Sequence, residues 1–138
     1  MTLIDPRTVD DAVLARLDAA VAPPGRLYVA PTGDPVLYFV VERPPGSQRT
    51  GSLGLPEQGL AYRLRLRAVG RHANGEEAGR AASDLLTRLA GALLDRSVPI
   101  TGDGWAASGR TALADGGVDV QGQLANATAD AELLIFPA

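Results

Sequence analysis

The segment Ala61–Val69, AYRLRLRAV, alternates apolar and charged side chains without a break. Neighbouring residues of a β-strand point to opposite faces of its sheet, so the pattern predicts a strand with one apolar and one charged face. The charged face holds Arg63, Arg65 and Arg67, which would stand about 7 Å apart at roughly 3.3 Å per residue. The apolar face must be buried against a second layer of structure.

The segment Asn74–Asp95, NGEEAGRAASDLLTRLAGALLD, predicts a helix that can supply this second layer. Asn74 is a favourable N-cap, Glu77 completes a pair that resembles a capping box, and Glu76 and Glu77 complement the helix dipole. Apolar residues recur at helical spacing and form one face: Ala78, Ala81, Ala82, Leu85, Leu89, Ala92 and Leu93. We expect the alanine half to pack closely and the leucine half to anchor the helix.

A first helix is predicted within residues 5–25, with Val9, Val13, Leu17 and Val21 on its apolar face. Thr8 and Asp11 have the spacing of a capping box, and Pro23, Pro24 and Gly25 end the helix. Two strands follow, RLYVA and PVLYFVVER, which the turn-like PTGD is expected to join as a hairpin. The second strand is apolar from Val36 to Val41, so both of its faces should be covered.

Residues 43–60 are rich in Pro, Gly and Ser and have no period, which predicts a long flexible loop. Such a loop is either a docking segment or an ordinary surface excursion. Near the end of the chain, strands are predicted at Trp105–Thr111, Val118–Leu124 and Glu132–Phe136, with a turn at Asp115–Gly117. The order α-β-β-β-α-β-β-β predicts an α+β fold in which one mostly antiparallel sheet is flanked by two main helices.

Size and composition indicate a single domain over residues 1–138. Hydrophobic residues make up 46% of the chain but aromatic residues only 4%, so the core must be built mainly from Leu, Val and Ala. A core with few large side chains favours stabilisation by assembly with other copies. The chain has no cysteine, which excludes disulfides, thiolate metal sites and a cysteine nucleophile. No apolar run approaches the roughly 20 residues that span a bilayer, so no membrane association is expected.

Charge is distributed unevenly along the chain. Residues 1–60 hold seven acids and five arginines, residues 61–75 hold four arginines and no acid, and residues 76–138 hold nine acids and four arginines. The net charges of these parts are therefore −2, +4 and −5, which sum to −3. A short basic island in a chain with a pI near 5.0 does not favour sequence-specific nucleic-acid binding.

No catalytic, cofactor-binding or metal-binding constellation is found in the sequence. The turn VGRHANGEE joins a strand to a helix, but it lacks the lysine of a phosphate loop, and Glu76 and Glu77 would repel an anion. His72 is the only histidine, and its neighbours predict an exposed turn. Asp10 and Asp11 are explained by the dipole of the first helix turn, as are Glu76 and Glu77. A non-enzymatic protein without cofactors is therefore expected.

The arginine row of Arg63, Arg65 and Arg67 is the main candidate for an interaction surface. It is either the solvent side of an antiparallel strand or a subunit contact, with the acidic residues 97–138 as a counter-surface in the same chain or in another copy. If it contacts another copy, Arg65→Glu should weaken assembly in a salt-dependent way. Arg49, Leu53, Leu55 and Trp105 are further candidates for a subunit or tube interface, although packing is the favoured role of Trp105.

From about residue 3 to its end, the chain resembles the tail terminator proteins of long-tailed, siphovirus-type bacteriophages that infect actinobacteria. The resemblance rests on the order of elements and on YRLRLRAVGRHANGEEAGRAASDLLTRLAGALLD, a short VPI link and a final apolar strand like AELLIF. An alanine-rich segment, ANATADAELLIFPA, stands where members of that family often have an aromatic residue.

The resemblance implies a structural virion protein that assembles as a homo-oligomeric ring, usually of six copies. Such a ring caps the tail tube at the head-proximal end of the tail and joins it to the head-tail connector proteins, with DNA passing through the ring and assembly in the host cytoplasm. Two alternatives are considered: another neck, connector or tail-tube protein, and a small cellular α+β domain that binds an anionic ligand on the Arg63–Arg67 face.

Overall fold

The computed structural model describes residues 6–33, 35–43, 48–50, 60–95, 100–102, 105–109 and 114–137. In chain order, the elements are α1 (Pro6–Ala20), β1 (Gly25–Leu27), β2 (Leu37–Glu42), β3 (Gln48–Thr50), β4 (Leu60–Arg71), α2 (Gly75–Leu94), β5 (Ile100–Gly102), β6 (Trp105–Gly109), β7 (Ala114–Gln121) and β8 (Leu124–Pro137). The fold is α+β, a mostly antiparallel sheet with two helices, as predicted. β3 and β5 are short strands that the predicted order does not contain.

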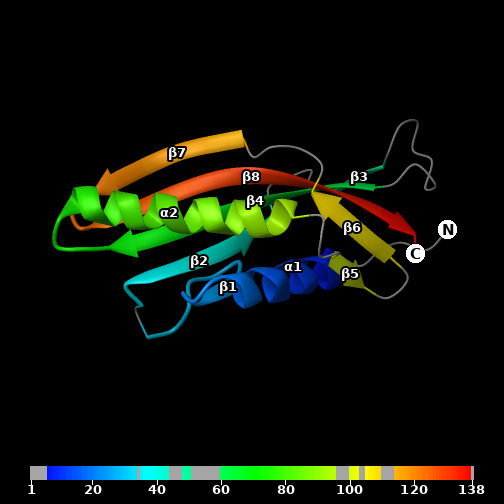
Figure 1. The fold of residues 1–138 in the computed structure, drawn as a ribbon, viewed down its shortest axis with the longest axis horizontal. Coiled ribbons are helices and arrows are strands. Elements are labelled where there is room, and N and C mark those ends of the chain that lie inside the picture. The colour runs from blue at the N-terminus through cyan, green and yellow to red at the C-terminus, as the bar shows by residue number, and fades with distance from the viewer. Residues whose placement is uncertain are drawn as a thin grey trace.

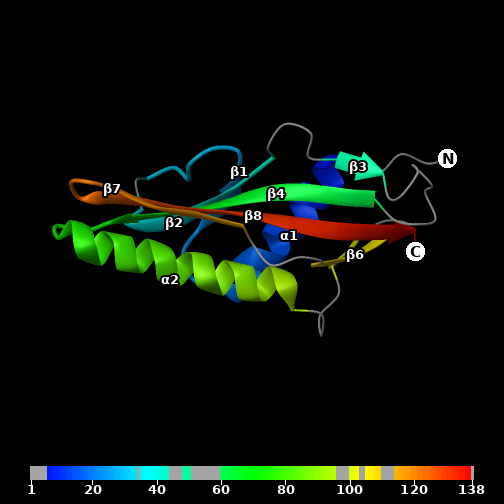
Figure 2. The same cartoon turned by 90° about the horizontal axis from the view of Figure 1, so that it is seen from above.

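The sheet is built around β4 and β8, which pair along twelve positions of each strand. The strand order is β1-β2-β4-β8-β6-β5, with β3 added to β4 and β7 added to β8. α2 lies along the sheet in Figure 1, with β7 at one edge and β2, β1 and α1 towards the other. Figure 2 shows α2 on one side of the sheet and the connection after β1 on the opposite side.

The alternation predicted for residues 61–69 is confirmed in β4. Tyr62, Leu64, Leu66 and Ala68 have no exposed surface and belong to the core, whereas Arg63, Arg65 and Arg67 lie on the opposite face. β8 alternates in the same way, with alanines at 125, 127, 129 and 131 on its buried side. The predicted apolar faces of both helices complete the core, including Val9, Val13 and Leu17 of α1 and Leu85, Leu89 and Leu93 of α2.

Close packing of the alanine half of α2 is also confirmed. Ala78, Gly79 and Ala82 are buried against the small residues of the sheet. A Cβ atom added to Gly70 of β4 would lie 2.7 Å from the carbonyl oxygen of Ala78. The missing side chain at Gly70 of β4 therefore lets this helix approach the sheet closely.

The predicted hairpin between the second and third elements is wrong, because β1 and β2 are parallel, with Gly25 opposite Phe39 and Leu27 opposite Val41. β1 ends where Tyr28 takes a left-handed backbone conformation with φ of 69°, and residues 28–36 return the chain to the start of β2. The prediction that both faces are covered from Val36 to Val41 is confirmed for Phe39, Val40 and Val41, which are fully buried, but not for Val36, which precedes β2 and is 68% exposed.

Three other local predictions need correction. Helix α1 begins at Pro6, so Thr8 lies inside the helix and is not its N-cap. The predicted loop at residues 43–60 contains β3, and residues 44–47 and 51–59 lie outside the described part. The last hairpin turns at Gly122 and Gln123, not at Asp115–Gly117, so β8 begins at Leu124 and not at Glu132.

The position of this last turn has a local physical cause. Gly122 has φ of 63° at the first central position of a two-residue turn, as a type II′ hairpin requires. The glycines at 116 and 117 lie instead in a β-bulge, where the register between β7 and β8 shifts between Asp115 and Val118. Because a β-bulge and a tight turn both favour glycine, the sequence DGG alone did not distinguish them.

Candidate interaction surface

The arginine row faces acidic side chains of its own chain. In the register of β4 and β8, Arg63 lies opposite Glu132 and Arg65 lies opposite Asp130. Nε of Arg65 is 3.0 Å from Oδ1 of Asp130. The hydrogen bond to Asp130 and the charge of this carboxylate raise the pKa of Arg65.

The third arginine of the row pairs with the neighbouring strand on the other side. Nη2 of Arg67 lies 2.8 Å from Oε1 of Glu42 in β2. Glu42 is also directly opposite Arg65 in the register of β2 and β4. Three arginines of β4 are thus interleaved with three carboxylates, those of Glu42, Asp130 and Glu132, on one face of the sheet.

This charge ladder changes what the arginine row can do. The row carries three positive charges and its immediate neighbours carry three negative charges, so the row itself offers no net positive charge to an anionic ligand. Exposed ion pairs contribute only about 0–1 kcal/mol each, and their main effect here is to favour one register of the three strands. The counter-charges lie within the same chain, and a contact of the row with another copy stays a prediction. An Arg65→Glu variant would also place a third acid beside Glu42 and Asp130, so it would disturb the monomer itself.

Of the remaining predicted interface residues in the described part, only Arg49 holds a register position on this face, because its partner Ala61 alternates in step with Arg63. Trp105 is only 2% exposed and belongs to the core, in agreement with the favoured packing role. Its indole ring covers Gly102 of β5 so closely that a Cβ atom there would lie 2.1 Å from the ring. Arg49 is in β3, opposite Ala61. Leu53 and Leu55 lie outside the described residues.

A second polar cluster surrounds Asp10, which is fully buried on α1. The hydroxyl of Tyr62 donates a hydrogen bond of 2.6 Å to Oδ1 of Asp10, and the hydroxyl of Tyr28 donates to Oδ2. Nε of Arg43 lies 2.9 Å from the same Oδ2. The guanidinium of Arg43 also lies over the ring of Tyr28, 5.4 Å from its centroid. One carboxylate therefore joins α1 to β4, to the residue after β1 and to the residue after β2.

Burial and the carboxylate of Asp10 both raise the pKa values of the hydroxyls of Tyr28 and Tyr62. Burial raises the pKa of Tyr62, and the hydrogen bond to Asp10 and the charge of Asp10 raise it further. The same causes, in the same order, raise the pKa of Tyr28. For Arg43, burial is the largest single influence and lowers the pKa, but the charge of Asp10 and the contributions of Tyr62 and Tyr28 together exceed it, so that the pKa of Arg43 is raised overall. The cluster is thus stable as one carboxylate held by two neutral phenols and one cation.

This cluster corrects the dipole explanation of Asp10, because Asp10 is not in the first turn of α1. A signal for it exists in the sequence. At 100° per residue, Asp10 falls within the arc covered by Val9, Val13, Leu17 and Val21. A carboxylate on the apolar face of a helix requires partners, and buried tyrosine hydroxyls require acceptors. What the sequence did not indicate is that Tyr28, Arg43 and Tyr62 meet there.

We expect the raised pKa values of these phenols to make stability fall at high pH. In the unfolded chain tyrosines ionise near pH 10, whereas the folded protein keeps these protons to higher pH. The folded state then binds more protons, so the free energy of unfolding decreases as pH rises above about 10. Tyr62→Phe should reduce this slope and, because a hydrogen bond to a buried carboxylate is lost, cost about 2 kcal/mol at neutral pH. Urea unfolding at a series of pH values checks both effects, and a slope unchanged in the variant would contradict the assignment.

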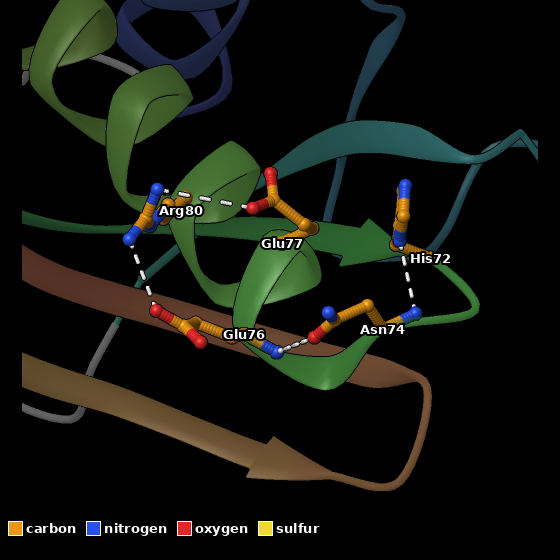
Figure 3. A network of polar contacts seen from close by, with 5 residues as sticks. All are labelled: His72, Asn74, Glu76, Glu77 and Arg80. Carbon is orange, nitrogen blue, oxygen red and sulfur yellow. Dashed lines mark hydrogen bonds and ion pairs between the residues drawn. The ribbon is translucent and has the colours of Figure 1, made fainter.

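The start of α2 is held by the polar network shown in Figure 3. The side chain of Asn74 accepts a hydrogen bond of 2.9 Å from the backbone N–H of Glu76, which confirms the predicted N-cap. Nδ1 of His72 accepts one of 2.9 Å from the N–H of Asn74. Arg80 pairs with Glu76 at 3.0 Å and lies 3.8 Å from Glu77. The cap and the ion pairs of Arg80 thus hold the first turn of α2.

The described residues include neither a metal-type cluster nor a membrane-spanning helix. They contain no group of three or more His, Asp or Glu side chains arranged to hold a metal ion. Neither described helix combines the length and apolarity needed to cross a membrane.

Comparison with known proteins shows a similarity of fold to one solved structure. No family model matches the sequence, and a search of curated proteins returns no match. Among solved structures, the chain is similar to one from the virion of a native gene transfer agent particle. The TM-score is 0.55 at 14% sequence identity, over 97% of this chain and 98% of that chain. The two chains therefore share one α+β architecture over their whole lengths.

Proposed function

We propose that this protein is a structural component of a phage-like virion, and specifically a tail terminator. The observation that carries the proposal is the fold similarity over 97% of the chain to a component of a gene transfer agent virion. The similarity covers almost all of both chains, so it is not limited to one shared motif.

The finer role rests on the resemblance of the sequence to tail terminators. The chain would form a ring, of six copies by analogy, at the head-proximal end of the tail. The ring would stop growth of the tail tube, contact the tail-tube protein on one side and the head-tail connector on the other, and let DNA pass. The surfaces of the ring would do this work.

The charge ladder argues against the alternative of an anion-binding cellular domain. Arg65 and Arg67 are each paired with a carboxylate of the same sheet face, so an anion would have to displace Asp130 or Glu42. A thermal-shift screen with phosphate, nucleotides and carboxylates is expected to give no stabilisation. A clear shift that is lost on replacing Arg63, Arg65 and Arg67 by glutamine would restore that alternative.

The proposed function is tested with purified protein and isolated tail tubes. Mass photometry should show one closed oligomer of defined mass, alone or when tubes are added, and electron microscopy should show it at one end of each tube. Tube protein polymerising in its presence should give tubes that stop growing. Long tubes made by this chain alone would indicate a tail-tube protein. A monomer that neither binds nor caps tubes would refute the proposal.

A further inference from the structure

The strand β7 forms an edge of the sheet. Among the described strands it pairs only with β8. Gln121 and Leu124 flank the two-residue turn and form its closing hydrogen-bonded pair. From Gln121 back along β7, residues that are hydrogen-bonded to β8 therefore alternate with residues that are not. The N–H and C=O groups of Val118 and Val120 consequently point away from β8. An edge with free backbone groups can accept a strand or loop from another chain.

The same edge is apolar on its helix side. The side chains of Val118 and Val120 are 46% and 45% exposed. Gly75 and Gly79 of α2 lie beside these valines, and a Cβ atom at Gly79 would be 3.3 Å from Cγ2 of Val120. The helix therefore covers the inner half of the two valines and leaves the outer half free. Asp119, between them, is exposed and faces the other side of the sheet. We call Val118, Asp119 and Val120 the β7 edge.

The opposite edge of the sheet also exposes apolar side chains. Tyr28 is 43% exposed, Val29 56% and Val36 68%, and the exposed Arg26 lies beside them in β1. We call these four residues the β1 patch. Figure 1 shows β7 and the segment from β1 to β2 on opposite sides of β4 and β8. The two exposed apolar surfaces therefore face away from each other.

One residue of the β1 patch, Tyr28, is held in place before any partner binds. The left-handed backbone of Tyr28 is fixed by the bond from its N–H to the carbonyl of Val41, 2.9 Å long, and by the bond from its hydroxyl to the buried Asp10. A side chain that is already ordered, as that of Tyr28 is, loses less entropy on binding.

We propose that the β7 edge of one copy docks on the β1 patch of the next copy, a contact that rests on the proposed ring-forming function. Both surfaces are apolar, and each carries one exposed charge of opposite sign, Asp119 on one and Arg26 on the other. No ion pair within the described residues uses either charge. Contact of two β7 edges with each other would bring Asp119 against Asp119, and contact of two β1 patches would bring Arg26 against Arg26. Only the head-to-tail arrangement avoids repulsion, and a repeated head-to-tail contact closes into a ring when its rotation permits.

Charge reversal tests this contact on the full chain. Asp119→Arg and Arg26→Asp alone each place like charges across the contact. Each should raise the protein concentration needed for half-assembly, in low salt, by about tenfold or more. The double variant, and an equimolar mixture of the two single variants, restore opposite charges at every contact and should assemble like the wild type. Asp84→Arg and Arg88→Asp on the exposed side of α2 are matched controls, and circular dichroism confirms that each variant is folded.

Each outcome bears on the contact and on the proposed function separately. Rings of wild-type protein that persist unchanged in both single variants would overturn the contact and leave the proposed function standing. Loss of assembly that neither the double variant nor the mixture restores would also overturn it. Sensitivity to Asp119→Arg but not to Arg26→Asp would show that β7 docks elsewhere. A wild-type chain that forms no ring and caps no tube would refute both proposals.

Discussion

Asp10→Leu is expected to lower the free energy of unfolding by about 3 kcal/mol, as the removal of one member of a buried charged cluster does. Leucine fits the apolar face of α1, so the cost does not come from lost volume. It comes from the partners: the buried hydroxyl of Tyr62 loses its acceptor, and Arg43 loses its counter-charge. The side chain of Arg43 is 33% exposed and can turn to water, which keeps the cost at the lower end of the range.

The neighbouring residue supplies the control for this experiment. Asp11 is exposed on the same turn of α1, so Asp11→Leu should change stability by only about 0.5 kcal/mol. Asp10→Asn keeps one carbonyl acceptor and should fall between the two. Urea unfolding at neutral pH measures all three variants. Equal stability of Asp10→Leu and Asp11→Leu would mean that the cluster contributes nothing to folding.

Gly70→Val is expected to lower the free energy of unfolding by about 3 kcal/mol, the upper part of the range for overpacking a core. Any Cβ atom at position 70 would lie 2.7 Å from the carbonyl oxygen of Ala78 and 3.4 Å from the nitrogen of Ala82. These are backbone atoms of α2, so the helix as a whole must move away from β4. Because valine is otherwise favourable in a strand, the decrease in the free energy of unfolding would come from the contact between α2 and β4.

A second glycine gives the opposite expectation. Nothing lies within 4 Å of a Cβ atom built on Gly91, which is exposed in the last turns of α2. Gly91→Ala should therefore stabilise the protein by about 0.5–1 kcal/mol through the higher helix propensity of alanine. Thermal unfolding followed by circular dichroism compares the two variants. A Gly70→Val protein as stable as the wild type would show that α2 does not pack so closely on β4.

Local patterns were enough to predict the main elements. The alternation of residues 61–69, the cap at Asn74 and the apolar faces of both helices depend on residues close in sequence, and the structure confirms them. The boundaries of short elements were less predictable. The start of α1 at Pro6, the turn at Gly122 and the bulge between Asp115 and Val118 depend on single residues that suit more than one backbone conformation.

The candidate interaction surface likewise has some features that local sequence predicts and others that only the folded chain shows. The sequence alone was enough to predict that β4 would carry a row of arginines and that acidic residues would be available for them, whereas its explanation of Asp10 by the helix dipole was wrong. Tertiary structure alone decided which groups meet: that β1 runs parallel to β2, that Asp130 and Glu42 stand beside the arginines, and that Tyr28, Tyr62 and Arg43 converge on Asp10. The reason is that strand order and register are set by the shared core and by contacts between residues distant in sequence, which no local pattern records.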